Sequence, residues 1–452
     1  MSTDAEKKDP NIIDTEPTKG FFITMLIRDV SLKDAIGDLV DNCVDGARSL
    51  VRDDDYSNYH IDITITPKTF LIKDNCGGIN IDTARDYAFR FGRPSDFPGI
   101  KGSVGQFGIG MKRALFKIGR HFNIKSSEST SSFELDVDVD EWAKQKEWQF
   151  KLKGYEVSNT GHVALGTEII IDKLNPEVIR DFGNATFINE LKTELELENL
   201  YPISKGLVIR INSIELKRRN LELLTSDEIK PAYFEQKYND DVNIRILAGV
   251  GEAILEEGGW YVFCNGRLVL GPEQTAITGW TGGRDKDGGP KYHGQYQRFR
   301  GYAFFEADDA SKLPWNTTKN GVDLDSAIFK GVRQQMVSIM KPINSFLNLM
   351  KEERENDPSP QDLFYSNIVQ KAVSVDIADI TKTNESIQKT TAKVFTHPVV
   401  DLKSEPKEKK VSITYKRDKD EVDRVKRVLK TNSTADVGIR TFEYFLEMEV
   451  GG

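Results

Sequence analysis

The chain has 452 residues and a formal charge of −9, with 38% hydrophobic and 29% charged residues. This length allows two or three domains with cores of their own, and the composition is typical of a soluble globular protein. No run approaches the roughly 18 apolar residues of a membrane-spanning helix, and residues 1–17 are too polar for a secretory signal, so no membrane partner is expected. The net charge argues against nucleic-acid binding by the whole surface but leaves room for a local basic face.

The cysteines are few and far apart: Cys43, Cys76 and Cys264. There is no CxxC motif and there are only five histidines, so the sequence does not favour a structural zinc site. Unpaired cysteines are typical of a reducing compartment, which predicts the cytoplasm.

The first part of the chain alternates helical and strand patterns. Ser31 is a good N-cap, and apolar residues recur at helical spacing behind it, which predicts a helix over residues 31–51. A second helix is expected over residues 111–119. Strands are expected over residues 60–66, 69–73, 133–139, 148–155 and 167–171.

The second part has a mixed pattern followed by a long helix. A helix near residues 188–200 precedes strands expected over residues 206–211, 242–248, 260–265 and 302–305, and residues 281–294 are predicted to form a loop. A helix over residues 326–355 ends before two prolines. The polar stretch up to residue 406 is expected to be partly extended, before helices over residues 418–430 and 436–449.

These patterns predict four regions: a flexible N-terminal arm (1–20), a first domain (21–195), a second domain (196–350), and a linker with a helical C-terminal region (351–452). Four short motifs fall in the first domain in a fixed order: DLVDN at residues 38–42, DNCGG at 74–78, GQFGIG at 105–110 and GTE at 166–168. Each motif alone is a weak signal, and their combination is the informative feature.

Asp38 and Asn42 are four residues apart on the first predicted helix, so they share one face. An amide oxygen is a suitable Mg²⁺ ligand, and a carboxylate one turn away can accept a proton from an attacking water. The alternative is an ordinary polar face of an amphipathic helix.

Asp74 ends a predicted strand and enters a turn with Gly77 and Gly78. A carboxylate there can accept a hydrogen bond from an exocyclic amine such as that of adenine, and glycines let the backbone approach the ring. The alternative is a simple Asp/Asn/Gly turn.

Gly105, Gly108 and Gly110 precede a helix that carries Lys112 and Arg113. Glycines with backbone N–H groups at a helix start are suited to binding phosphate. The spacing is neither GxGxxG nor GxxxxGK[ST], so it supports neither a Rossmann nor a P-loop fold.

Together the segments DLVDNCVDGA, IKDNCGGI, GQFGIGMK and GTEIII resemble the motifs of the GHKL ATPases, which include gyrase B, MutL, the large heat-shock chaperones, histidine kinases and MORC proteins. The resemblance covers about residues 21–173. It implies an α+β fold of the Bergerat type, in which helices cover one face of a mixed sheet. It also implies that ATP and Mg²⁺ are the ligands.

The resemblance also implies roles for individual residues. Asn42 would bind Mg²⁺ and phosphate, Asp74 would bind adenine N6 beside Gly78, and Thr167 would hydrogen-bond nearby. A lid over the phosphates would contain Gly105, Gln106, Phe107, Gly108, Ile109, Gly110 and Lys112. The sequence departs from the family pattern at the catalytic base, where Asp38 replaces glutamate, and at Cys76, which replaces glycine. The shorter side chain of Asp38 predicts slow hydrolysis.

In the second domain, FCNGR at residues 263–267 resembles the turn of the transducer domain in gyrase, MutL and MORC proteins. WNTTK at residues 315–319 resembles the loop that carries a catalytic lysine in these proteins, which here would be Lys319. A surface lysine is the alternative. The resemblance implies an ATP-driven conformational switch that forms a homodimer on ATP binding.

The sequence therefore favours a slow Mg-dependent ATPase that acts on a macromolecular partner, either DNA or protein, by analogy in bacterial defence or DNA transactions. A non-hydrolysing ATP-binding scaffold stays open as an alternative. A histidine-kinase-like phosphotransferase is disfavoured because no phosphoacceptor histidine helix precedes the ATP-binding motifs. Basic and aromatic residues mix over residues 281–300, which fits either nucleic acid binding or a surface loop.

Overall fold

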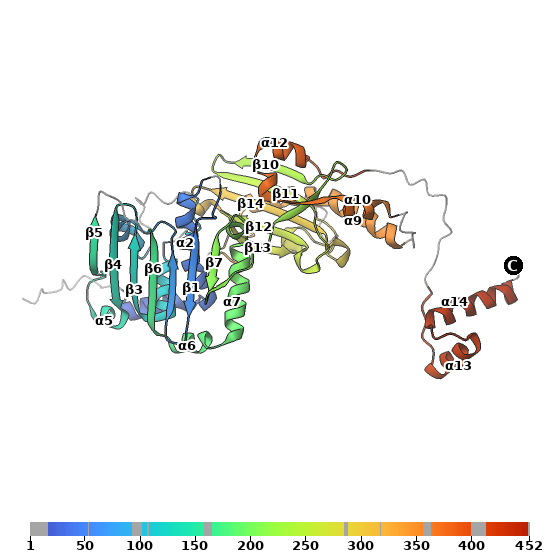
Figure 1. The fold of residues 1–452 in the computed structure, drawn as a ribbon, viewed down its shortest axis with the longest axis horizontal. Helices are drawn as coiled ribbons and strands as arrows, with labels where there is room; N and C mark the ends of the chain where they lie inside the picture. The colour runs from blue at the N-terminus through green and yellow to red at the C-terminus, as the bar shows by residue number, and fades with distance from the viewer. Residues whose placement is uncertain are drawn as a thin grey trace, which may run out of the picture. The chain divides into compact units, whose positions relative to one another are not determined.

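The structure, a computed structural model, describes residues 17–52, 54–92, 102–105, 108–157, 165–283, 288–316, 318–355, 363–398 and 413–450. It divides into two compact units, Met1–Pro398 and Val399–Gly452. Within the described residues, no helix combines the length and the apolar character needed to cross a bilayer. The described residues of the first unit form two large sheets, each with its own hydrophobic core, and one two-stranded sheet (Figure 1).

The first sheet has eight strands in the order β5-β4-β3-β6-β2-β1-β7-β8. Only the β1–β7 pair is parallel, so the sheet is mixed, as expected. The strands are β1 His60–Ile65, β2 Phe70–Asp74, β3 Gly119–Ser127, β4 Ser131–Asp138, β5 Leu152–Val157, β6 Gly166–Leu174, β7 Val208–Ile211 and β8 Ile214–Glu215. The strand predicted over residues 148–155 starts later, because Trp148 and Phe150 pack with Trp142 in an aromatic cluster.

Helices cover one face of this sheet (Figure 1), which confirms the predicted α+β sandwich. They are α1 Lys19–Arg28, α2 Leu32–Leu50, α3 Ile81–Thr83, α4 Gly110–Ile118, α5 Val139–Lys144, α6 Pro176–Phe182, α7 Ala185–Glu198 and α8 Leu200–Ser204. Helix α2 begins as predicted, since Ser31 Oγ accepts a hydrogen bond from the backbone N–H of Asp34. Its apolar stripe is buried against the sheet, which places its polar residues beside α4 and α7.

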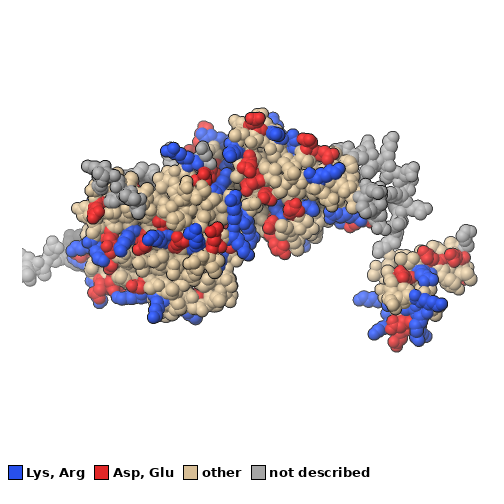
Figure 2. Space-filling view, viewed as in Figure 1, with Lys and Arg blue, Asp and Glu red and all other residues tan. Residues whose placement is uncertain are grey.

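The opposite face of the sheet carries a row of alternating charges, which Figure 2 shows as blue and red side chains side by side. Neighbouring strands place opposite charges in register along this row: Glu215, Arg210, Asp62, Lys73, Glu168, Lys125 and Glu134. Ion pairs join several of them, among them Lys73–Glu168 at 3.0 Å. Opposite charges on neighbouring strands stabilise a sheet face without an apolar cover.

The second sheet has five strands in the order β10-β11-β14-β12-β13, and β12 and β14 are parallel. The strands are β10 Ala232–Tyr238, β11 Val242–Val250, β12 Gly259–Cys264, β13 Arg267–Glu273 and β14 Phe299–Ala307. The long helix α9, Ala327–Glu355, packs on this sheet and contributes buried residues such as Met336 and Met340. The prediction of a mixed region followed by a long helix is confirmed in this part of the chain.

The polar stretch after α9 was expected to be partly extended, and helices that were not predicted also lie within its residues 363–398. These residues form α10 Phe364–Lys371, strand β15 Val373–Asp376, α11 Ile377–Ile380 and α12 Asn384–Thr390. Strand β15 pairs with β9, Glu222–Thr225. Ile377 and Ile380 of the following helix α11 are buried in a hydrophobic cluster that includes a residue of β9. These elements are too short to show a hydrophobic period above their polar background.

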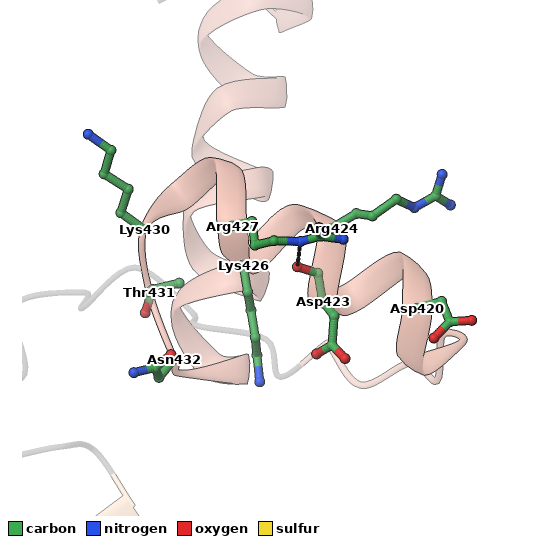
Figure 3. A pocket seen from close by; sticks show the side chains of 8 residues that line it. All are labelled: Asp420, Asp423, Arg424, Lys426, Arg427, Lys430, Thr431 and Asn432. Carbon is green, nitrogen blue, oxygen red and sulfur yellow. Dashed lines mark hydrogen bonds between the residues drawn. The ribbon is translucent and has the colours of Figure 1, made fainter.

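The second unit contains α13 Lys419–Leu429 and α14 Thr434–Phe445, which is followed by a π-helical turn, Leu446–Val450. Figure 3 shows a surface recess along α13 and the turn after it, lined by Asp420, Asp423, Arg424, Lys426, Arg427, Lys430, Thr431 and Asn432. Two acidic and four basic side chains line the recess. No residue of the two helices is buried, so this pair has no core of its own.

Candidate functional site

Helix α2 brings four polar residues of the first motif and its continuation to one region. Asp38, Asp41 and Asp45 are buried, while Asn42 is exposed. Burial of three carboxylates on one helix is costly unless each has donors nearby. Each of the three has such donors, and they come from different parts of the chain.

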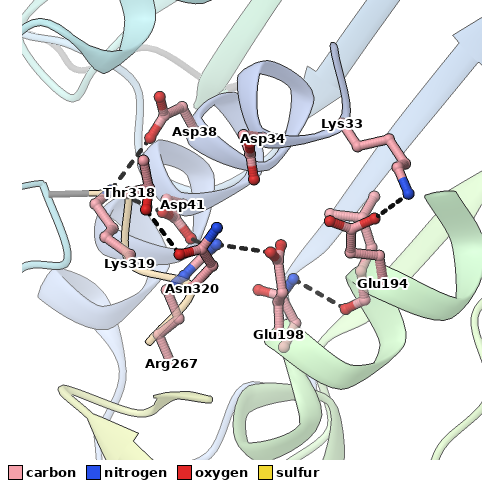
Figure 4. Close-up of polar contacts among 12 residues, drawn as sticks. Lys33, Asp34, Asp38, Asp41, Glu194, Glu198, Arg267, Thr318, Lys319 and Asn320 are labelled. Atoms are coloured by element: carbon pink, nitrogen blue, oxygen red, sulfur yellow. Dashed lines mark hydrogen bonds and ion pairs between the residues drawn. The ribbon is translucent and has the colours of Figure 1, made fainter. Parts of the chain in front are cut away.

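Asp38 lies between two cations. Its Oδ2 accepts a hydrogen bond from Arg113 Nη2 of α4 at 2.5 Å. Its Oδ1 is 3.3 Å from Nζ of Lys319, which lies in the loop before α9 (Figure 4). The structure therefore brings together the two residues predicted to be catalytic, although they are far apart in the sequence.

Asp38 and Asp41 share Lys319 in one network of ion pairs, and Asp41 is the more buried of the two carboxylates. It accepts hydrogen bonds from Lys319 at 2.9 Å and from Arg267 Nη1, and Arg267 Nη2 also pairs with Glu198 of α7 at 2.8 Å (Figure 4). Burial alone would raise the pKa of Asp41, but Arg267 and Lys319 outweigh it and lower that pKa. Burial raises the pKa of Glu198 to about 7 despite its pairing with Arg267.

Asp45 holds the segment before α4. Its carboxylate accepts hydrogen bonds from the N–H groups of Val104, at 2.7 and 2.9 Å, and of Gly105, at 3.0 Å. From the other side, Asn265 Nδ2 donates to the carbonyl of Ser103 at 2.9 Å. Val104 is buried in the hydrophobic core of the second sheet. Both sheets therefore hold residues 103–105.

Asp74 is buried where β2 ends, and its donors are neutral. Its Oδ1 accepts from the N–H of Cys76 at 2.7 Å and from the N–H of Thr167 at 3.3 Å, while the thiol of Cys43 donates to Oδ2 at 3.2 Å. Burial raises the pKa of Asp74. Each carboxylate oxygen has two lone pairs, so Oδ2 can accept one more hydrogen bond.

Thr167 contacts this carboxylate through its backbone N–H, and Gly78 lies in the turn that follows Asp74. The hydroxyl of Thr167 is 2.9 Å from that of Ser126, which in turn accepts from the N–H of Ile79 at 2.8 Å. Gly78 has a φ of +72°, and a Cβ there would lie 2.1 Å from the carbonyl oxygen of Ser127. A side chain at position 78 is therefore excluded by both conformation and space.

The glycine segment leads directly into α4, and Gly110 is the first residue of that helix. Ile109 is its N-cap residue, and Gly108 has a φ of +62°. Lys112 is buried, and its Nζ donates to the carbonyls of Ala88, at 2.8 Å, and Gly108. Gln106 and Phe107 lie outside the described residues.

Four functional candidates were missed by sequence reasoning: Arg113, Arg267, Glu198 and Asp45. Arg113 was noted only as a residue of the helix after the glycine segment, and Arg267 only as a member of the FCNGR motif. Asp45 is the third carboxylate on the same helix face, and this spacing was a usable signal. Glu198 had no signal in the sequence, because its pairing with Arg267 depends on how α7 packs against α2 and β13.

A metal ion here would have few protein ligands. Among the described residues, no group of three or more histidine, cysteine or acidic side chains could hold a metal. The exposed carboxamide of Asn42 fits Mg²⁺, which commonly takes one protein oxygen and completes its shell with phosphate oxygens and water. The donor set therefore fits a metal that arrives with a nucleotide.

The comparisons with known proteins agree with this geometry. The family described as "Histidine kinase-, DNA gyrase B-, and HSP90-like ATPase" matches residues 30–167. No curated protein matches the chain. The matched segment contains α2, the turn after β2, α4 and the start of β6, which are the elements that surround Asp38, Asn42, Asp74 and Thr167. Residues 30–167 therefore form a domain of the GHKL ATPase type.

Proposed function

We propose that the protein binds Mg-ATP between α2 and the turn after β2 and hydrolyses it slowly. The contact of Lys319 with Asp38 is the main support for hydrolysis. It places a cation from the loop between β14 and α9 beside a carboxylate on α2. A carboxylate and an ammonium group beside each other provide a proton acceptor and a charge that stabilises a transferred phosphoryl group.

In this proposal each end of the nucleotide has its own residues. Asp74 accepts a hydrogen bond from adenine N6 through the free lone pair of Oδ2, next to Gly78 and Thr167. At the other end, Asn42 holds Mg²⁺, which neutralises phosphate charge when bound. Asp38 accepts the proton of the attacking water. The ammonium group of Lys319 moves from Asp38 to the γ-phosphate.

The residues of the glycine segment would complete the phosphate site. Gly105, Gly108, Ile109 and Gly110 lead into the N-terminus of α4, where backbone N–H groups favour anions. Lys112 would leave its carbonyl partners to reach a phosphate. The same role is proposed for Gln106 and Phe107 on the resemblance alone.

We further propose that ATP drives a conformational switch with dimerisation. Lys319 contacts Asp38 and Asp41 of α2, so a γ-phosphate would compete with these carboxylates for its ammonium group. A ligand that changes such contacts shifts the population of conformations. Sedimentation velocity with and without a non-hydrolysable ATP analogue tests dimerisation, and an unchanged monomer would contradict it.

The macromolecular partner, DNA or protein, and a role in defence or DNA transactions rest on analogy with the MORC, MutL and gyrase branches. Measuring phosphate release with and without duplex DNA tests the DNA proposal directly. The four predicted regions (1–20, 21–195, 196–350 and 351–452) and the transducer-like role of the second sheet remain proposals. All three cysteines are free thiols in the structure, which is the support for a cytoplasmic location.

A second candidate function is ATP binding without turnover. Asp38 is shorter than the glutamate of the family and is engaged by two cations, which favours binding without turnover. Phosphate release from wild type, Asp38→Asn and Asn42→Ala separates the two functions. Hydrolysis predicts that wild type exceeds both variants, whereas a scaffold predicts equal background rates with ATP still bound to wild type.

A further inference from the structure

We propose that Arg113 is a positioning residue for the hydrolytic reaction: it fixes Oδ2 of Asp38, so that Oδ1 receives the proton of the attacking water. This inference rests on the proposed ATPase function. It adds an assignment of the two carboxylate oxygens and a role for an arginine outside the family motifs quoted above.

The contact between Arg113 and Asp38 is close and sheltered. Nη2 lies 2.5 Å from Oδ2, and the side chains are 15% and 8% exposed. Gly110, one turn earlier on α4, makes this approach feasible, because a Cβ there would lie 3.0–3.2 Å from the carboxyl atoms of Asp38. Asp38 is therefore held against the first turn of α4 and is not free to choose among rotamers.

The two cations around Asp38 differ in their attachment. Arg113 belongs to α4, which packs on α2 in the same hydrophobic core. Lys319 belongs to a loop beside the second sheet, and it is the cation proposed to move to the phosphate. When Lys319 leaves, Oδ1 loses its partner while Oδ2 keeps Arg113. The oxygen that becomes free is therefore defined by the structure.

The other charges near this carboxylate have partners of their own. Asp41 lies on the same helix and pairs with Arg267 and Lys319. Arg267 pairs with Glu198 as well. Among the ion pairs of the described residues, Arg113 pairs with Asp38 and with no other carboxylate.

The chemical step balances with these groups. Oxygen of water forms a bond to the γ-phosphorus, and the bond to the β–γ bridging oxygen breaks with its electron pair passing to ADP. The proton of water passes to Oδ1 of Asp38. A guanidinium group has N–H donors and no acceptor, so Arg113 orients the base and does not replace it.

A double-mutant cycle on the full-length protein tests this role, with Arg113→Gln, Asp38→Asn and the double variant. We expect Arg113→Gln to lower kcat about 10- to 100-fold at an unchanged KM, since misplacement of a base by about 1 Å has effects of this size. In the Asp38→Asn background, the same change should alter kcat by less than about twofold. Arg113→Lys should restore most of kcat, since one ammonium donor can hold Oδ2.

The matched control is Arg120→Gln, which removes an arginine from an exposed pair with Asp140 and should leave kcat unchanged. Thermal unfolding and calorimetry with Mg-ATP accompany every variant. Equal kcat losses from Arg113→Gln in both backgrounds would show a purely structural role and overturn the inference, as would no loss at all. If Arg113→Gln does not fold, Arg113→Met with and without Asp38→Asn takes its place in the cycle, with the same expected losses of kcat. Failure of wild type to bind Mg-ATP would instead contradict the proposed function itself.

Discussion

The two ends of the proposed nucleotide site are built differently. At the phosphate end, Asp38 and Asp41 are held by cations from α4, from the first residue of β13 and from the loop before α9. At the adenine end, Asp74 is held by two backbone N–H groups and a thiol, all from the first sheet and α2. The carboxylates of the phosphate end are thus held by charged groups from both sheets and their helices. The carboxylate of the adenine end is held by neutral donors from the first sheet and α2.

This difference separates two kinds of effect. Changes at the phosphate end should alter turnover and the joining of the two sheets, because charged groups there bridge them. Changes at the adenine end should alter affinity and leave the rest of the protein unaffected. The four predictions that follow test this separation, from the largest expected effect to the smallest.

Arg267→Ala should produce the largest loss of stability. It leaves Asp41 and Glu198 buried without the guanidinium group, and breaking a buried ion pair costs about 3–5 kcal/mol. Urea unfolding measures this loss. The control is Arg210→Ala, whose pair with Asp62 is well exposed and should contribute about 1 kcal/mol or less. Equal losses for both variants would show that the network does not join the sheets.

Asp38→Asn should abolish most turnover while ATP still binds. Removing a general base lowers kcat by about 10²- to 10⁴-fold. Phosphate release measures kcat, and calorimetry with Mg-ATP measures affinity. Asp140→Asn, on the exposed end of an ion pair, should leave both unchanged. If Asp38→Asn loses affinity to the same extent as turnover, the residue binds substrate and does not act as a base.

Asp74→Asn should weaken ATP binding about 10- to 100-fold, because a hydrogen bond to a charged group contributes about 1.5–3 kcal/mol. The carboxylate of Asp74 accepts a hydrogen bond from adenine N6, whereas the amide group of the variant can present its own N–H donors to that amine. Asp62→Asn on the open face of the sheet is the control. An unchanged dissociation constant for Asp74→Asn would place adenine elsewhere.

Glu198→Gln should have the smallest effect on turnover and on ATP binding, and its change should be visible in the pH dependence of stability. The pKa of Glu198 is raised from 4.5 to about 7 by burial, so the folded state binds more protons than the unfolded state between these values. The free energy of unfolding therefore falls as pH rises from about 4.5 to about 7, by at most about 1.4 kcal/mol per pH unit. Glu198→Gln should remove this part of the slope. Identical slopes for both proteins would contradict the assigned pKa.

The first sheet and its helices were predictable because their patterns are local. The Ser31 cap, the stripe of α2 and the alternation of β1 act within a few residues. The adenine end was predictable for the same reason, since Asp74 and Gly78 belong to one turn. Thr167 required the family resemblance, because only the pairing of β6 with β2 brings it close.

The cations of the phosphate end could not be derived from sequence spacing. Arg113 reaches α2 through the packing of α4. Arg267 reaches α2 from the start of β13, more than 200 residues away in the chain. Lys319 was found only because its loop resembles that of related ATPases. The short elements of residues 363–398 were missed because their burial comes from β9 and α9, and not from any period of their own.

One buried valine has a consequence for how the protein can be divided. Val104 lies between two motifs of the ATP-binding domain, yet its side chain fills a place in the core of the second sheet. A fragment cut after the first sheet would therefore present this side chain to water and would leave the Ser103 carbonyl without its Asn265 donor. The ATP-binding half is thus expected to need its neighbour as a folding partner.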